Sequence, residues 1–177
     1  FLFFTVIIMH SDDIRKAFFD FMTESPRNHK IIPSVSLVPI NDPSLLFVNS
    51  GMFPLVPYLL GETHPEGTRL CNFQRCLRTS QDEVEEIGDN RHTLMFEMMG
   101  NWSLNEYFKE EQIKWVLDLY VNRFKLDVNK LYVSVFAGDA DAPRDDDAIR
   151  FWQEQFNKYD IAAEVGPDTA QGEKSRG

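Results

Sequence analysis

Alternating apolar and polar residues mark two stretches near the middle of the chain, at positions 70–77 and 93–99. Side chains that alternate in this way are typical of a strand that buries one of its faces. The connection between the stretches, residues 78–92, is acidic and contains Gly88. The pattern therefore predicts an antiparallel hairpin with a long loop.

Three other stretches carry apolar residues at spacings of three and four, as amphipathic helices do. The first begins at Ser11, whose hydroxyl can cap a helix, and stops before Pro26. The second spans about residues 109–124, and the third begins at Asp145 or Asp146. The predicted buried stripes are Ile14, Ala17, Phe18, Phe21 and Met22; Ile113, Val116, Leu117, Tyr120 and Phe124; and Ile149, Trp152 and Phe156.

Shorter apolar runs predict further strands at 45–48, 131–136 and 161–165, the first of them behind the turn signal Asn41-Asp42-Pro43. Residues 53–68 are rich in proline and glycine and indicate a loop with at most a short helix. Strands and helices do not alternate as they do in a parallel α/β protein. The order favours an α+β fold, in which helices pack against an antiparallel sheet.

Length and composition indicate one domain, or a piece of one, from an intracellular protein. A chain of 177 residues with 15 Phe and 3 Trp can bury ~70% of its unfolded surface. Cys71 and Cys76 are too few for a disulfide framework, and their odd separation predicts opposite faces of one strand. We interpret both as reduced thiols. The four histidines show no metal-ligand spacing.

The net charge of −10 argues against a general nucleic-acid-binding protein, whose affinity would come from neutralising phosphates. This acidic balance is ordinary for a cytoplasmic protein, and we expect no association with a membrane. Residues 1–8 are apolar, but they lack the basic start of a signal peptide and the length of a membrane span. We expect a non-native extension before Met9, with the domain at 9–177; an added strand is the alternative.

Candidate chemistry gathers where the predicted hairpin opens into its loop. Arg75 and Arg78 lie at the end of the first strand, and Phe96 lies in the returning strand. A guanidinium offers a fork of donors to a phosphate, and an aromatic ring can cover a flat base. These residues predict a nucleotide site laid on a sheet. By spacing alone, a salt bridge from Arg78 to the acidic loop fits equally well. A phenylalanine in a strand, such as Phe96, is by itself far more often part of the core.

The hairpin residues also carry a resemblance to a known family. The sequence RCLR followed by GDNRHTLMFEMMGNWS resembles the second signature motif of the alanyl-tRNA synthetases, a branch of the class II synthetases. Residues 32–52 are similar to the first motif of that family, a helix followed by a long strand. The likeness runs from about Asp12 to Asp168. It implies a class II synthetase-like antiparallel sheet flanked by helices, incomplete at its C-terminal end.

The resemblance implies a role for each matching residue. Arg78 matches the arginine that contacts the α-phosphate of ATP, and it is the predicted catalytic residue. Phe96 would carry the adenine, with the backbone of Met98 beside the edge of the base. Arg91 and His92 would frame the triphosphate, although His92 also fits a loop-anchoring role. No residue here is expected to ligate a metal.

One stretch departs from the pattern of the family. Many bacterial members have Gly-Gly-Lys-His directly after the arginine, and this chain has Thr79-Ser80-Gln81-Asp82 there. The cation that the lysine supplies near the phosphates is therefore missing. Neutralising the β- and γ-phosphates would then depend on Mg²⁺ and Arg91.

The activity that the resemblance implies is alanine–tRNA ligation. The carboxylate of alanine attacks the α-phosphate of ATP, and the alanyl group then passes to the 3′ end of tRNA(Ala). The implied partners are alanine, ATP with Mg²⁺, and tRNA(Ala); the oligomeric state stays open. The alanine pocket, the third motif and a zinc-dependent editing region have no counterpart in the sequence, so we expect an amino-terminal fragment, inactive alone. A non-catalytic nucleotide- or protein-binding module and a purely structural α+β domain are the alternatives.

Overall fold

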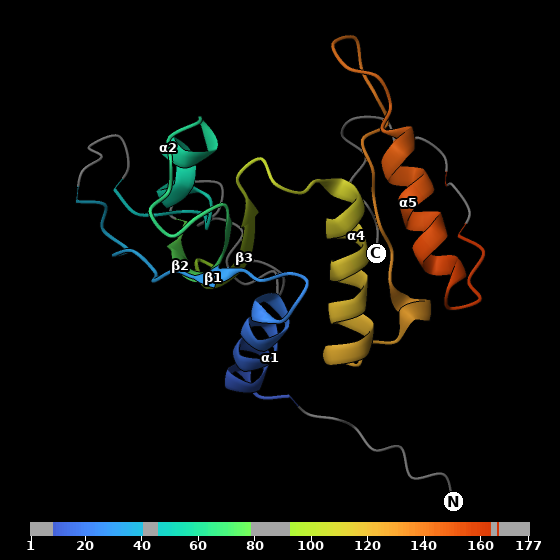
Figure 1. Ribbon diagram of the computed structural model, residues 1–177, viewed down its shortest axis with the longest axis horizontal. Helices are drawn as coiled ribbons and strands as arrows, with labels where there is room; N and C mark the ends of the chain where they lie inside the picture. Colours follow the sequence, from blue (N-terminus) through green and yellow to red (C-terminus); the bar gives the residue numbers. More distant parts are fainter. Residues whose placement is uncertain (1–8, 41–45, 79–92, 164–165, 167–177) are drawn as a thin grey trace, which may run out of the picture. The chain divides into compact units, whose positions relative to one another are not determined.

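The computed structural model describes residues 9–40, 46–78, 93–163 and 166, and the chain divides into two compact units, Phe1–Glu106 and Tyr107–Gly177. The first unit contains a sheet (Figure 1). Its three strands are hydrogen-bonded in the order β1-β2-β3. Strand β2 (Arg69–Leu77) pairs antiparallel with β3 (Met95–Ser103) along its whole length. This confirms the predicted hairpin. The two-residue strand β1 (Lys30–Ile31) pairs with β2 in parallel.

Helix α1 (Ser11–Thr23) packs on one face of the sheet through aromatic rings. The rings of Phe18 and Phe19 lie 5.6 and 4.6 Å from the ring of Phe73 in β2. The helix begins one residue earlier than predicted, with His10 rather than Ser11 at the capping position. Here the carboxylate of Asp13 accepts the backbone N–H of His10 at 3.3 Å, so the first turn is closed by an acidic side chain.

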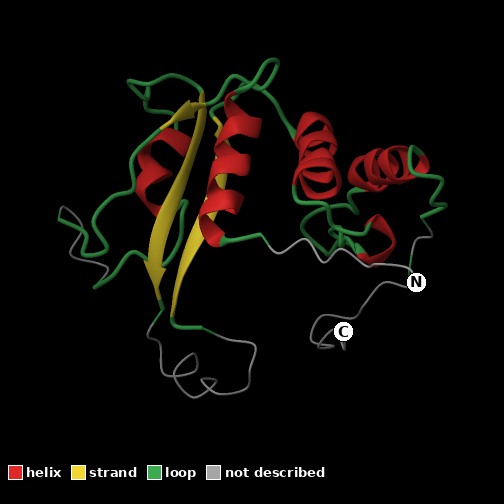
Figure 2. Cartoon of the chain, turned by 90° about the horizontal axis from the view of Figure 1, so that it is seen from below, coloured by secondary structure: helices red, strands yellow, loops and turns green. Residues whose placement is uncertain are grey.

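The opposite face of the sheet is covered by the proline-rich segment. Two short helices, η1 (Phe53–Leu55) and α2 (Val56–Leu59), lie on the side of the sheet away from α1 (Figures 1 and 2). A buried cluster of Ile32, Leu55 and Leu70 joins this segment to β2. The prediction of a loop with a short helix is confirmed. Because β2 is covered on both faces, Cys71 and Cys76 are both buried, and both are free thiols.

The strand predicted at 45–48, and with it the long strand of the first motif, is wrong for the described residues. Residues 46–48 are not a strand, and the side chain of Leu46 is 82% exposed. Beside β2, the regular backbone pairing that follows β1 reaches Ile32, whose N–H donates to the carbonyl of Cys71 at 3.0 Å. Further along, the side-chain amide of Gln74 replaces backbone pairing. It accepts the N–H of Val35 at 3.0 Å and donates to the carbonyl of Val35 at 3.3 Å.

The second unit is built on two helices, α4 (Lys109–Asp118) and α5 (Asp146–Asn157). Asp145 caps α5 as predicted, accepting the N–H of Ala148 at 3.1 Å and the ammonium of Lys109 at 2.6 Å. The short helix η3 (Val128–Lys130) lies between them in the sequence. No helix within the described ranges has both the length and the apolar run that crossing a membrane would take.

The predicted stripe of the helix at 109–124 needs a correction. The π-helical turn η2 (Leu119–Arg123) follows α4, and its wider turn is closed by a bond from the N–H of Phe124 to the carbonyl of Leu119 at 2.9 Å. This change of phase leaves Tyr120 39% exposed. The side chains that are buried are Ile113, Trp115, Leu117 and Leu119.

The strands predicted at 131–136 and 161–165 are also not found where the structure is described. Residues 131–136 and 161–163 are not strands, and Tyr132 is 93% exposed. An apolar alternation becomes a strand only when a neighbouring strand takes its hydrogen bonds. Among the described residues, strand pairing involves β1, β2 and β3 alone. Residues 164–165, and the extension expected at 1–8, lie outside the described residues.

Candidate nucleotide site

Arg78 stands at the point where the hairpin opens. Its backbone N–H donates to the carbonyl of Leu94 at 2.9 Å, which extends the pairing one step beyond β2. Its side chain is half-buried, and Nε donates to the backbone carbonyl of Asn49 at 3.2 Å. The guanidinium is therefore held from a neighbouring loop as well as from its own strand.

Phe96 lies beside Arg78 on the same face of the hairpin. In the register of the two strands Phe96 is opposite Cys76, and alternation along β2 turns position 78 to the same face as position 76. The Cζ atom of Arg78 is 5.2 Å from the centre of the Phe96 ring. This is within the ~6 Å of a cation–π contact. The structure thus brings together the two side chains that the sequence assigned to one site.

Met98 follows on the same face, two residues beyond Phe96, and is in register with Gln74. Its sulfur atom accepts the backbone N–H of Gly51 at 3.2 Å, so the side chain is used to hold a loop. The role predicted for Met98 belongs to its backbone and stays a prediction. Arg91 and His92 lie outside the described residues, as does the acidic loop that was the alternative partner of Arg78.

Glu97 and Arg75 belong to the other face of the hairpin. Glu97 pairs with Arg15 of α1, with Nη2 and Oε2 2.6 Å apart, and this contact ties the helix to β3. Arg75 is opposite Glu97 in register and is exposed. Arg75 therefore lies on the face of the hairpin opposite to Arg78. The contact with Arg15 supports a structural role for Glu97.

The loop at 48–51 contributes a group that the sequence did not identify, the carbonyl of Asn49. A pattern of side chains does not predict which backbone carbonyl accepts a hydrogen bond. The one signal in the sequence is the run Asn49-Ser50-Gly51, whose residues are typical of a turn. Gly51 does not adopt a positive φ. It is instead buried against Met98 and Trp102, where a Cβ atom would lie 3.4 Å from each.

The titratable groups buried near the hairpin do not supply a nucleophile. Burial raises the pKa of Cys71 to about 12. Burial also raises the pKa of Cys76, against a smaller lowering by the charge of Arg78. His29 is buried with Nδ1 at 3.1 Å from the carbonyl of Met22, and burial is the main cause that lowers its pKa to about 4. Both thiols stay protonated near neutral pH.

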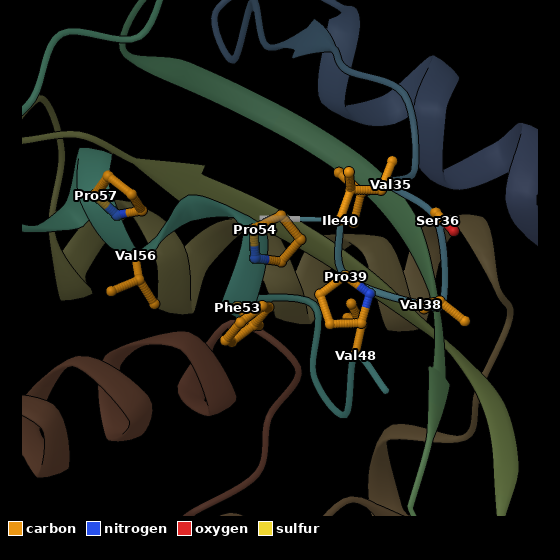
Figure 3. A pocket seen from close by; sticks show the side chains of 10 residues that line it. All are labelled: Val35, Ser36, Val38, Pro39, Ile40, Val48, Phe53, Pro54, Val56 and Pro57. Carbon is orange, nitrogen blue, oxygen red and sulfur yellow. The ribbon is translucent and has the colours of Figure 1, made fainter. Parts of the chain in front are cut away.

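An apolar pocket of about 490 Å³ is lined by the start of the proline-rich segment and by residues that precede it (Figure 3). Four of its lining residues belong to that segment and six precede it in the sequence: Val35, Ser36, Val38, Pro39, Ile40, Val48, Phe53, Pro54, Val56 and Pro57. None of them is a residue predicted to bind ATP. The polar groups that would orient a nucleotide are at the hairpin, so we place the candidate site there and not in this pocket.

The structure is a mixed sheet flanked by helices. One face of its long hairpin presents Arg78 and the ring of Phe96. The family model described as "tRNA synthetases class II (A)" matches residues 13–164. This chain belongs to that family.

Relatives of this chain are named more narrowly, as alanine–tRNA ligases. The protein of Borreliella afzelii is 46% identical over 147 residues, which are 82% of this chain and 24% of that protein. The protein of Treponema pallidum is 44% identical over 149 residues, 83% of this chain and 24% of that protein. For Rubrobacter xylanophilus the identity is 41% over 146 residues, 82% of this chain and 16% of that protein. The chain thus spans about a quarter, or less, of the length of these relatives.

Proposed function

We propose that this chain carries the ATP-binding part of an enzyme that activates alanine and joins it to tRNA(Ala). The observation that carries the proposal is the position of the Arg78 guanidinium over the Phe96 ring at the open end of the hairpin. A guanidinium that donates hydrogen bonds to a phosphate and an aromatic ring that stacks on a base can, on one face, bind the two ends of a nucleotide at once. The family match and the names of the relatives support ATP as that nucleotide.

In the proposed reaction, an oxygen of the alanine carboxylate attacks the α-phosphorus of ATP in line, and pyrophosphate leaves. A hydroxyl of the terminal adenosine of tRNA(Ala) then attacks the carbonyl carbon of alanyl-adenylate, and AMP leaves. Arg78 would stabilise the charge that builds on the α-phosphate oxygens. Phe96 and the backbone of Met98 would fix the adenine, so that the phosphate lies in line with the attacking oxygen. Neither step needs a protein nucleophile.

Mg²⁺ would enter with ATP, bound to its phosphates. The described residues include no group of three or more His, Cys, Asp or Glu side chains that could hold a metal. We therefore assign no step to a protein-bound ion, and the framing of the triphosphate by Arg91 and His92 is part of the proposal. Cytoplasmic location and binding of tRNA(Ala) follow from the proposed activity, and zinc would belong to an editing region outside this sequence.

Titration of the 177-residue chain with a β,γ-imido analogue of ATP tests the proposal. Arg78→Ala should weaken binding by roughly 1.5–3 kcal/mol, about 10- to 150-fold, because a charge-assisted hydrogen bond is lost. Arg75→Ala is the matched control: it removes the same group three residues earlier, from the other face of the hairpin, and should leave affinity unchanged. Equal affinities of the wild-type chain and Arg78→Ala would contradict the proposed role of Arg78.

A further inference from the structure

The loop at 48–51 is fastened at both ends around the carbonyl that holds Arg78. At its first end, Val48 is buried, donates its N–H to the carbonyl of Leu37 at 2.8 Å and accepts the N–H of Leu77 at 3.0 Å. Leu77 is the last residue of β2, directly before Arg78. The backbone of the loop is thus hydrogen-bonded to the end of β2, directly before Arg78.

The other end of the loop is fixed by close packing. Gly51 is buried, and its N–H donates to the sulfur of Met98 at 3.2 Å. A Cβ atom at position 51 would lie 3.4 Å from the Cβ atom of Met98 and 3.4 Å from Cζ2 of Trp102. A methyl group would just fit there. A branched side chain would push the loop off β3, because both neighbours belong to a paired strand and cannot retreat.

We propose that Gly51 is a positioning residue for Arg78. The missing side chain lets the loop rest on Met98 and Trp102, and this contact sets the place of the Asn49 carbonyl. That carbonyl accepts a hydrogen bond from the Nε–H of Arg78 at 3.2 Å. This bond fixes the orientation of the guanidinium plane over the Phe96 ring. The same hydrogen bond sets the direction in which the terminal Nη N–H groups of Arg78 point. The inference rests on the proposed function, since it assumes that Arg78 binds a phosphate.

The inference makes a claim that general damage to the fold would not produce. In the proposed site Arg78 binds the phosphate and Phe96 binds the base. A displaced Asn49 carbonyl therefore weakens binding of a nucleotide and leaves binding of a nucleoside unchanged. Loss of the sheet, or of the face that carries Phe96, would weaken both.

The test is titration of the 177-residue chain with the β,γ-imido analogue of ATP and, separately, with adenosine. Gly51→Val should weaken binding of the analogue about tenfold, on the order of one charge-assisted hydrogen bond, and leave adenosine affinity unchanged. Met52→Val is the matched control, at the exposed residue that follows Gly51, and should change neither affinity. In a chain that already carries Arg78→Ala, Gly51→Val should cause no further loss, because the two residues act on one interaction.

Three results would overturn the inference: equal losses for the analogue and adenosine, no loss for either, or a full further loss in the Arg78→Ala chain. If circular dichroism shows that Gly51→Val does not fold, Gly51→Ser takes its place, with an expected loss of roughly threefold for the analogue alone. A wild-type chain that binds neither ligand would instead overturn the proposed function. The two failures are therefore distinguishable.

Discussion

At the scale of single residues, the site depends on which face of a strand each side chain occupies. Phe96 and Glu97 are neighbours in the sequence, yet Phe96 lies beside Arg78 while Glu97 pairs with Arg15 of α1. Alternation along a strand predicts that separation. It does not predict that the carbonyl of Asn49 takes part, because a backbone acceptor has no signature in the sequence.

Removal of the Phe96 ring should weaken binding of ATP and adenosine alike. Base–aromatic stacking contributes ~1–3 kcal/mol where it has been measured, so Phe96→Ala should lower both affinities by about 5- to 150-fold. Met95→Ala removes a neighbouring side chain that is 70% exposed and should change neither affinity. Isothermal titration calorimetry with both ligands checks this. A loss for ATP alone would show that the ring does not carry the base.

His29 should make the stability of the fold depend on pH. Its pKa is lowered from 6.5 to about 4, first by burial and then by the charges of Arg69 and Arg27, against an opposing effect of Glu106 and a bond to Met22. The unfolded chain therefore binds a proton at a higher pH than the native one. The stabilising contribution is complete above pH 6.5 and is lost as the pH falls from 6.5 toward 4.

Urea unfolding at pH 7.5 and at pH 5.5 measures this effect. The free energy of unfolding should be lower at pH 5.5 by on the order of 1 kcal/mol. In His29→Gln, which keeps a donor for the carbonyl of Met22, the difference between the two pH values should shrink. If the unfolding free energy of that variant still differs between the two pH values as much as in the wild-type chain, groups other than His29 cause the pH dependence.

At the scale of elements, the sequence predicted what is settled locally and missed what depends on distant partners. The hairpin, α1 and the Asp145 cap of α5 follow from alternation, helical spacing and capping, and all three are present. The runs at 45–48 and 131–136 have strand-like composition but no strand pairing in the described residues. Beside β2 the deciding residue is Gln74, whose buried amide pairs with Val35 from 39 positions away.

Replacement of that amide should loosen the edge of β2. Gln74→Met keeps a side chain of similar length but leaves the N–H of Val35 without its acceptor, which should cost about 1–3 kcal/mol of unfolding free energy. Urea unfolding gives the total, and hydrogen exchange at the Val35 amide gives the local effect, which should be faster exchange. Protection of that amide as strong as in the wild-type chain would show that Gln74 is not what orders the segment.

At the scale of the whole molecule, the chain belongs to the class II synthetase family and spans about a quarter of the length of its Borreliella relative. The fold class was predictable because one long hairpin and its helices carry it. The complete candidate site was not, since no pattern in the sequence predicts the Asn49 carbonyl that holds Arg78. Arg91 and His92 stay predictions, because they lie outside the described residues. What the structure adds is the meeting of Arg78, Phe96 and the loop at 48–51 on one face of the sheet.

The most direct test of that meeting is a crystal structure of the chain with the β,γ-imido analogue of ATP bound. We predict that the adenine lies against the ring of Phe96 and that the α-phosphate accepts hydrogen bonds from the guanidinium of Arg78. A nucleotide bound elsewhere, or bound here with its phosphates directed away from Arg78, would contradict the proposed site.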